Sequence, residues 1–412
     1  MRTSGPGSRS GRRDPGPPAA LGEEEAPDRP SGRWPHGSFG TQAAAVLRGA
    51  GGALTLDALA EALPAVKRPG GDWRARLRQS LARTPQVCLV GTSTYDLAER
   101  RLSGARLRHV LTQAEARHGL LLAEPELADL LLWWETFLRD GTALPILDAD
   151  GASLEARLAF VTGPDLEPAR GWGYRLYRVV TGLGEWMARA GARPGDDVCF
   201  QALPPDGRRF RVSVDPAAPG PRGDLAVARA DASLAEAALA ILARARALTL
   251  PGDLLRRLAG QMDLRVGPGP HLPVFTLGRD ARFAFDGSSY GPFALAVERN
   301  RRRITTSHPR PEDYPSDWPA RDPVWELRRL AEGPARLTLW YTLAGPIQVG
   351  GTPHPARLAS VLARMVQSRA MLWDLLQDRS RLLNVPAARR RAGRQRYGNV
   401  IQGPWPGAGG EG

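Results

Sequence analysis

The sequence predicts an α+β chain of several domains, in which two helical units flank a strand-rich segment. Two observations predict this class. A pattern of three short amphipathic helices followed by two strands occurs twice, near residues 40–100 and near residues 231–300. Between the two copies, apolar and polar residues alternate with the period of half-buried strands. The chain has 412 residues, which is too long for one compact core, so we expect about two to four domains.

Stretches rich in proline, glycine and charge set the expected boundaries. The predicted segments are a disordered lead at 1–38, a first helical unit at 40–100, a linker helix and strand-rich domain at 103–216, a linker at 217–230, a second helical unit at 231–300, a linker at 301–323, a C-terminal strand-helix segment at 324–382 and a basic disordered tail at 383–412.

The two helical units are predicted to be a repeat. In each, leucines spaced by three and four residues indicate short helices, and a Leu-Thr-Leu stretch joins the first two, at 54–56 and at 248–250. The downstream parts align without a gap over the pairs Leu81–Leu277, Val87–Phe283 and Gly91–Gly287. Thr94 then aligns with Pro292, across a turn that is two residues longer in the second copy. Three helices followed by a hairpin describe a winged helix, so we expect two winged-helix domains.

Both copies, over about 60 residues each, resemble the HARE-type winged helix-turn-helix family, and the second copy carries the clearer pattern. The resemblance lies in the run Asp280-Ala281-Arg282-Phe283, followed by a turn and the residues Phe293-Ala294-Leu295. That family includes the amino-terminal domain of the bacterial RNA polymerase delta subunit and modules of chromatin-associated proteins. The first copy departs from the pattern, because Thr84-Pro85-Gln86-Val87 stands in the corresponding place. The resemblance implies DNA binding or docking on a transcription component.

The central segment is predicted to hold two hairpins, with turns at Asp148-Ala149-Asp150-Gly151 and Pro204-Pro205-Asp206-Gly207. A strand at 170–180 and a short helix with Trp186 lie between them. This order resembles the DNA-binding pseudobarrel of plant auxin-response-type factors, through Gly171-Trp172 and Gly195-Asp196-Asp197-Val198. The resemblance implies a small β-barrel or pseudobarrel domain.

Asp196 and Asp197 raise the question of a catalytic carboxylate pair. Pro194-Gly195-Asp196 has the composition of a tight turn between a helix and a strand. Adjacent side chains of a strand point to opposite faces of the sheet, so these two carboxylates are not expected to converge on one substrate.

Basic residues mark the candidate contacts with nucleic acid. In the predicted third helix of the first unit, Leu77 and Leu81 face inward, which leaves the arginines for phosphates or guanines. The corresponding stretch of the second unit has no arginine and several helix breakers. The candidate nucleic-acid-binding residues are Arg74, Arg76, Arg78 and Arg83 of that helix, Arg175, Arg178, Arg209 and Arg211 of the central strands, and Arg389, Arg390, Arg391, Arg394 and Arg396 of the tail.

The sequence indicates neither an enzyme nor a cofactor. The six histidines and two cysteines are scattered without metal-ligand spacing, and no P-loop, nucleophile elbow or dinucleotide fingerprint occurs. We therefore expect a cytoplasmic, nucleoid-associated or transcription-linked protein that binds duplex DNA. The formal net charge of +13 fits a polyanionic partner, although the codon bias of a GC-rich genome also produces arginine.

Two further partners stay open at this stage. One alternative function is a protein-interaction scaffold that docks on RNA polymerase. The amphipathic helix near 354–382 packs either on the preceding domain or on a second copy of the chain. No stretch approaches 18 consecutive apolar residues, so no membrane partner is expected.

Overall fold

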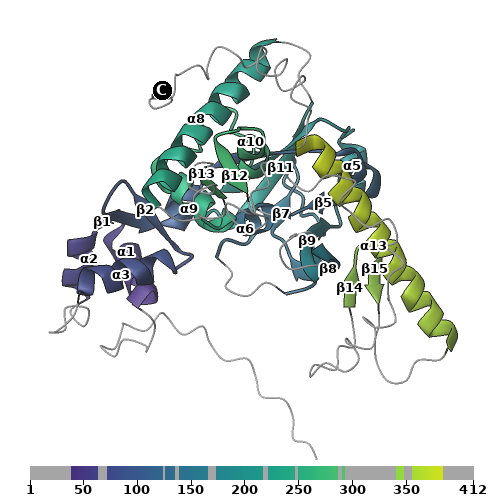
Figure 1. Cartoon of the computed structure of the whole chain (residues 1–412), viewed down its shortest axis with the longest axis horizontal. Helices are drawn as coiled ribbons and strands as arrows, with labels where there is room; N and C mark the ends of the chain where they lie inside the picture. Colours follow the sequence, from purple (N-terminus) through teal and green to yellow (C-terminus); the bar gives the residue numbers. More distant parts are fainter. Residues whose placement is uncertain are drawn as a thin grey trace, which may run out of the picture. The chain divides into compact units, whose positions relative to one another are not determined.

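A computed structural model describes residues 39–63, 72–123, 126–134, 139–165, 173–216, 221–245, 249–285, 290–292, 340–347 and 355–383. All of them belong to one unit, Ser38–Gly412. The architecture is α+β, with several small sheets (Figure 1). Among the helices of these ranges, none is long and apolar enough to cross a lipid bilayer.

The first helical unit combines three helices with a three-stranded antiparallel sheet. Its elements are α1 (Phe39–Ala50), β1 (Leu54–Thr55), α2 (Leu56–Ala62), α3 (Trp73–Ala82), β2 (Val87–Val90) and β3 (Thr94–Leu97), and the strand order is β1-β3-β2. Leu47, Leu59, Leu77 and Leu81 are fully buried in its core. The predicted helices and hairpin are therefore confirmed, and the Leu-Thr-Leu stretch adds a third strand that pairs with β3.

The second helical unit has the same order of elements. It consists of α8 (Pro221–Ala245), α9 (Pro251–Gln261), α10 (Pro273–Gly278), β12 (Phe283–Phe285) and β13 (Tyr290–Pro292). Thr249 forms a single antiparallel bridge to Tyr290, which corresponds to the pairing of β1 with β3 in the first unit. Within the hairpin, Phe283 pairs with Pro292 as Val87 pairs with Leu97. Pro292 therefore does not occupy the position of Thr94, and the predicted two-residue extension of the turn is wrong.

The central segment forms two four-stranded sheets instead of a closed barrel. The first sheet has the order β4-β10-β11-β7 and the second has the order β5-β9-β8-β6. Their strands are β4 (Arg106–Val110), β5 (Leu121–Leu122), β6 (Thr142–Ala143), β7 (Ile146–Leu147), β8 (Arg157–Asp165), β9 (Gly173–Thr181), β10 (Asp197–Leu203) and β11 (Arg209–Asp215). Helix α4 (Ala98–Leu102) leads from the first helical unit into β4, and α5 (Gln113–His118), α6 (Leu127–Leu131) and α7 (Gly184–Arg189) connect the central strands.

The second helical unit prevents closure of the first central sheet at β4. The connection between α9 and α10 runs along the free edge of this strand. The amide of Arg106 donates to the carbonyl of Leu264 at 2.9 Å, and the amide of Leu272 donates to the carbonyl of Arg108 at 2.8 Å. Because residues 264–272 occupy this edge, β4 cannot pair with another strand to close a barrel. The prediction of a barrel or pseudobarrel is corrected on this ground.

The central turns are confirmed, but one hairpin has different partners. Asp148 accepts hydrogen bonds from the amides of Asp150 and Ala152, which fixes the predicted turn. Across this turn, however, only Leu147 and Ser153 form a bridge. Strand β7 instead pairs in parallel with β11, and β8 pairs with β9. Strands β10 and β11 form the second predicted hairpin in register from Asp197↔Asp215 to Leu203↔Arg209.

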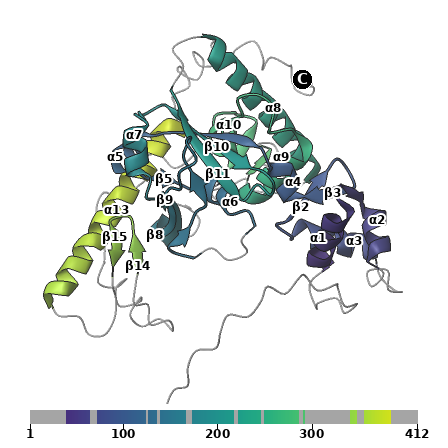
Figure 2. The ribbon, with the colours of Figure 1, turned by 180° about the vertical axis from the view of Figure 1, so that it is seen from behind.

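The C-terminal helix α13 (Pro355–Leu383) packs on the second central sheet. Figures 1 and 2 show it alongside β8 and β9, near α5. Leu372 and Leu375 are fully buried against Val179 and its neighbours. The short hairpin of β14 (Trp340–Thr342) and β15 (Gly345–Ile347) also contacts α13. The apolar face considered for self-association thus packs within the chain over these residues.

One core joins segments that are distant in the sequence. It contains Cys88 from β2 of the first helical unit, Leu102 from α4, Phe200 from the central sheet, and Leu255 and Leu272 from the second helical unit. The domain boundaries remain a prediction, but side-chain packing crosses three of the predicted segments.

Candidate nucleic-acid interface

Helix α3 presents its basic side to solvent. Asp72 caps its N-terminus by accepting a hydrogen bond from the amide of Ala75 at 3.1 Å, which satisfies one of the free amides of the first turn. Leu77 and Leu81 are the buried side chains of this helix. The four arginines predicted here are all exposed: Arg74, Arg76, Arg78 and Arg83.

Only one of these four arginines is neutralised within the described ranges. Arg74 donates to Asp57 of α2 at 2.8 Å and lies over the ring of Trp73. Arg76, Arg78 and Arg83 have no ion pair in that part of the chain. Because an unpaired guanidinium is free to bind an anion, these three carry the positive charge of the α3 surface.

The corresponding helix of the second unit is buried. Pro273, Val274 and Leu277 of α10 are buried, and Val274 belongs to the core shared with the central sheets. The ring of Phe275 packs against His271, with 4.6 Å between their centroids. A groove of DNA cannot receive a helix whose side chains already fill a protein core, so α10 is not a candidate recognition helix.

The first central sheet adds a second basic surface, which we name the sheet face: Arg106, Gln201, Arg209 and Arg211. Arg209 and Arg211 are exposed on β11, while Phe210 and Val212 between and after them are buried, as the alternation predicts. Gln201 pairs with Arg211 on one side and with Arg106 of β4 on the other, so the three side chains form a row across the strands.

Sequence reasoning missed Arg106. The stretch RLRHV gave little signal, because the polar residues Arg108 and His109 of this strand are buried and only Arg106 is exposed. What the sequence lacked was the pairing of β4 with β10, which joins residues about a hundred positions apart. Arg106, Arg209 and Arg211 have no carboxylate partner where the chain is described.

The remaining predicted arginines contribute less to an interface. Arg178 donates to Asp129 at 2.8 Å and its side chain is only 17% exposed, so its charge is compensated within the chain. Arg175 lies on β9, and the structure describes this residue by its backbone alone. The arginines of the predicted tail lie outside the described residues: Arg389, Arg390, Arg391, Arg394 and Arg396.

The two consecutive carboxylates of the central segment have separate structural roles. Asp196 is buried and accepts a hydrogen bond from the amide of Arg193 at 2.8 Å. Gly195 has a φ of 93°, which glycine adopts without steric cost. The predicted turn is confirmed, and Asp196 closes it.

Asp197 instead joins an ionic network that is buried except at Asp215, and we name it the Asp197 network: Arg108, Asp197, Asp215, Asp231 and His271. Arg108 donates to Asp197 at 3.0 Å and to Asp215 at 2.6 Å. His271 contacts Asp197 through Nε2 at 3.1 Å and Asp231 through Nδ1 at 2.8 Å. The network therefore links β4 and β10 to α8 and to the connection before α10.

The charges of this network are mutually stabilised. Burial alone would lower the pKa of His271, but its hydrogen bonds to Asp197 and Asp231 raise the pKa to about 9. Burial likewise opposes ionisation of Asp197, but hydrogen bonds from His271 and Arg108 hold the pKa of this carboxyl below its usual value. At neutral pH, His271 is therefore a cation between two carboxylates, and the network is a structural clamp.

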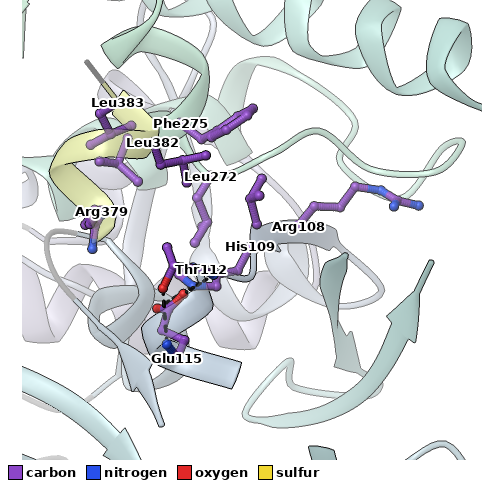
Figure 3. Close-up of a pocket in the computed structure, with 11 residues that line it drawn as sticks. Arg108, His109, Thr112, Glu115, Leu272, Phe275, Arg379, Leu382 and Leu383 are labelled. Atoms are coloured by element: carbon purple, nitrogen blue, oxygen red, sulfur yellow. Dashed lines mark hydrogen bonds and ion pairs between the residues drawn. The ribbon is translucent and has the colours of Figure 1, made fainter. Parts of the chain in front are cut away.

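A small pocket lies where β4, α10 and the end of α13 meet (Figure 3). His109, Phe275 and Arg379 are among its lining residues, and Nε2 of His109 lies 2.8 Å from Oε1 of Glu115. Burial would raise the pKa of Glu115, but the charge and hydrogen bond of His109 lower it. The cavity measures about 20 Å³, which is room for one water molecule. Glu115 also caps α5 through Thr112, so this pair has a structural explanation.

No group of three or more histidine, cysteine, aspartate or glutamate side chains that could hold a metal ion occurs in the described ranges.

Comparisons of the chain with protein-family models, curated proteins and solved structures find no match. The residues themselves therefore carry the functional argument.

Proposed function

We propose that this chain binds duplex DNA, with α3 as the helix that enters the major groove. The observation that carries the proposal is the exposed face of α3, where Arg76, Arg78 and Arg83 have no carboxylate partner in the described part of the chain. In a winged helix, the third helix reads base edges and the hairpin touches the backbone. The element order of the first unit and its strand order β1-β3-β2 support this interpretation.

Electrostatics supports the same partner. The formal net charge is +13, and each phosphate that an arginine neutralises releases condensed counterions. The sheet face offers a second group of unpaired arginines, which suits contacts with phosphates. The proposed role requires no cofactor and no catalysis, and a chain with this role would act at the nucleoid.

The test is a fluorescence-anisotropy titration of a random duplex with the full chain at several salt concentrations. The variant R76Q/R83Q removes two unpaired cations from α3, so the slope of log affinity against log salt should become shallower by about 1.8. R193Q is the matched control, because Arg193 is an exposed arginine in the turn before β10 and its loss should leave the slope nearly unchanged.

Three results would overturn the proposal. In the first, the wild-type chain shows no salt-sensitive binding. In the second, R76Q/R83Q behaves like R193Q. In the third, binding survives in R76Q/R83Q but disappears when the five tail arginines become glutamine, which would assign DNA binding to residues 389–396. Capture of purified RNA polymerase by a chain that binds no duplex would favour the scaffold function instead.

A further inference from the structure

The sheet face brings arginines from two distant strands onto one small area of the surface. Gln201 of β10 is the direct partner of Arg211 on β11 and of Arg106 on β4. Because neighbouring strands lie about 4.8 Å apart, the Cα atoms of Arg106 and Arg211 are about 10 Å apart across the sheet. Arg209 lies two residues from Arg211 on the same face, at about 7 Å along β11. All three arginines are exposed.

The arginines that border the sheet face are neutralised within the chain, whereas those of the sheet face are not. Arg208, in the turn before β11, donates to Glu99 at 3.3 Å. Arg265, in the connection along β4, donates to Asp263 at 2.7 Å. None of the three arginines of the sheet face has such a partner in the described part of the chain. Like charges on neighbouring strands repel one another, so a partner with negative charge would stabilise this arrangement.

The carboxylates of the same strands lie too far along the sheet to neutralise these arginines. Asp197 and Asp215 are paired at the other end of β10 and β11, each four residues from the sheet face. Four residues of a strand span about 13 Å, which exceeds the Debye length of about 10 Å in 0.1 M salt. Arg108 and His271 already bind these carboxylates. A polyanion is therefore expected over the end of the sheet near the turn between β10 and β11.

The composition of this surface favours the backbone of a duplex over a single strand. Proteins hold single strands largely by stacking the bases on aromatic side chains. The outward residues of β10 and β11 at the basic end are Gln201, Leu203, Arg209, Arg211 and Ser213, and none of them is aromatic. Arginine and glutamine side chains donate to phosphate oxygens, which line both strands of a duplex at close spacing.

We propose that the sheet face binds the phosphate backbone of duplex DNA, independently of base sequence, as a second contact besides α3. This role rests on the proposed function, because it takes duplex DNA as the partner. The two surfaces then divide the work of binding. Helix α3 reads base edges in the major groove, and the central sheet supplies affinity for any duplex.

The first test is the duplex titration with the full chain and the variant R106Q/R211Q. The slope of log affinity against log salt should become shallower by about 1.8, and the affinity in 0.1 M salt should fall roughly 60-fold, as expected for two lost phosphate contacts. R139Q/R244Q is the matched control for net charge. Arg139 and Arg244 are also exposed, but they lie on separate elements outside the sheet face, so this variant should keep nearly the wild-type slope.

The second test compares duplexes of equal length that contain only A·T pairs or only G·C pairs. R106Q/R211Q should lower the affinity for both by the same factor, because phosphate contacts carry no sequence information. An unequal loss would assign base reading to the sheet face and would overturn the backbone contact. The thermal midpoint of R106Q/R211Q should equal that of the wild type, since exposed side chains without a partner contribute little to stability.

The outcomes separate this inference from the proposed function. If R76Q/R83Q reduces the salt slope while R106Q/R211Q behaves like R139Q/R244Q, the sheet-face contact is wrong and the proposed function stands. If R106Q/R211Q reduces the slope and R76Q/R83Q does not, the sheet-face contact stands and α3 is not the DNA-binding helix.

A wild-type chain that binds no duplex would overturn both proposals. Vesicles of phosphatidylcholine and phosphatidylserine then identify the other source of negative charge. Binding to these vesicles that is lost in R106Q/R211Q, and retained in R139Q/R244Q, would assign the sheet face to an anionic membrane surface instead of DNA.

Discussion

The two helical units share one order of elements and differ in the surroundings of their third helix. Helix α3 buries only Leu77 and Leu81 and leaves its arginines in solvent. Helix α10 buries Pro273, Val274 and Leu277, and Val274 contributes to the core shared with the central sheets. The comparison teaches that the same local fold serves as a free surface in one copy and as a packing element in the other.

The hairpin of the second unit, like its third helix, contacts the rest of the chain more closely than that of the first unit. Tyr290 of β13 is fully buried and donates its hydroxyl hydrogen to Glu126 at 2.6 Å. Tyr95, which has the corresponding place in the register of the first hairpin, is also buried but has no hydrogen bond to a side chain in the described ranges. Polar contacts to the central segment thus hold the second unit in place. The following predictions perturb three contacts of the second unit, two with the central segment and one with the first unit.

The largest effect is expected from the Asp197 network. D197A leaves Arg108 and His271 without their shared carboxylate, and loss of one member of a buried ion pair costs about 3–5 kcal/mol. We expect this loss in the free energy of unfolding by urea. Hydrogen exchange should rise in α8 and α10 and not in α1–α3. D150A, in an exposed turn, is the control; equal stability of the two variants would contradict the clamp.

A pH-dependent effect of the same order is expected from Glu126. Burial raises the pKa of this carboxyl from 4.5 to about 7. Between these values, the unfolded chain has lost the proton and the folded chain retains it, so the stability of the wild type falls as pH rises. E126Q keeps an acceptor for Tyr290 and does not ionise. Its unfolding free energy relative to the wild type should therefore rise by roughly 3 kcal/mol across this window.

The control for this pH dependence is E185Q, since Glu185 is exposed in the first turn of α7. Urea unfolding between pH 4.5 and 7 provides the measurement. Parallel pH curves for E126Q and the wild type would show that the buried contact between Tyr290 and Glu126 does not titrate as described.

The smallest effect is expected at the contact between α9 and β2. In G260A the new methyl group must displace the Leu89 backbone, which should cost about 1–3 kcal/mol in the free energy of unfolding. Helix propensity alone would make this substitution stabilising. A loss of stability would therefore show that close packing against Leu89 outweighs helix propensity. The control is G52A, where no atom lies within 4 Å of the added Cβ. A more stable G260A would mean that the two units are not fitted closely here.

Local elements were predictable from the sequence, because local patterns determine them. Leucine spacing predicted the helices of both units, and the composition of the turns predicted those at Asp148 and Asp196. The exposed arginines of α3 followed from the same spacing, since the inward leucines fix the outward face.

Long-range pairing was not predictable, and it accounts for the errors. The resemblance to a barrel depends on strand order alone, whereas closure depends on what occupies the edge of β4. Residues 264–272 occupy that edge, and no local pattern shows this. Arg106 entered the sheet face only through the pairing of β4 with β10, which joins distant segments. Arg178 is a weaker candidate for DNA contact than the sequence predicted, because it forms an ion pair with Asp129.

The coverage of β4 by residues 264–272 has a consequence for the behaviour of the chain in concentrated solution. An open strand edge presents a row of unpaired amides and carbonyls to which another molecule can add a strand. The connection between α9 and α10 satisfies several of these groups on β4. A chain cut before Leu264 would expose this edge and would be expected to aggregate by strand addition. The second helical unit thus protects the sheet from self-assembly, whatever it contributes to binding.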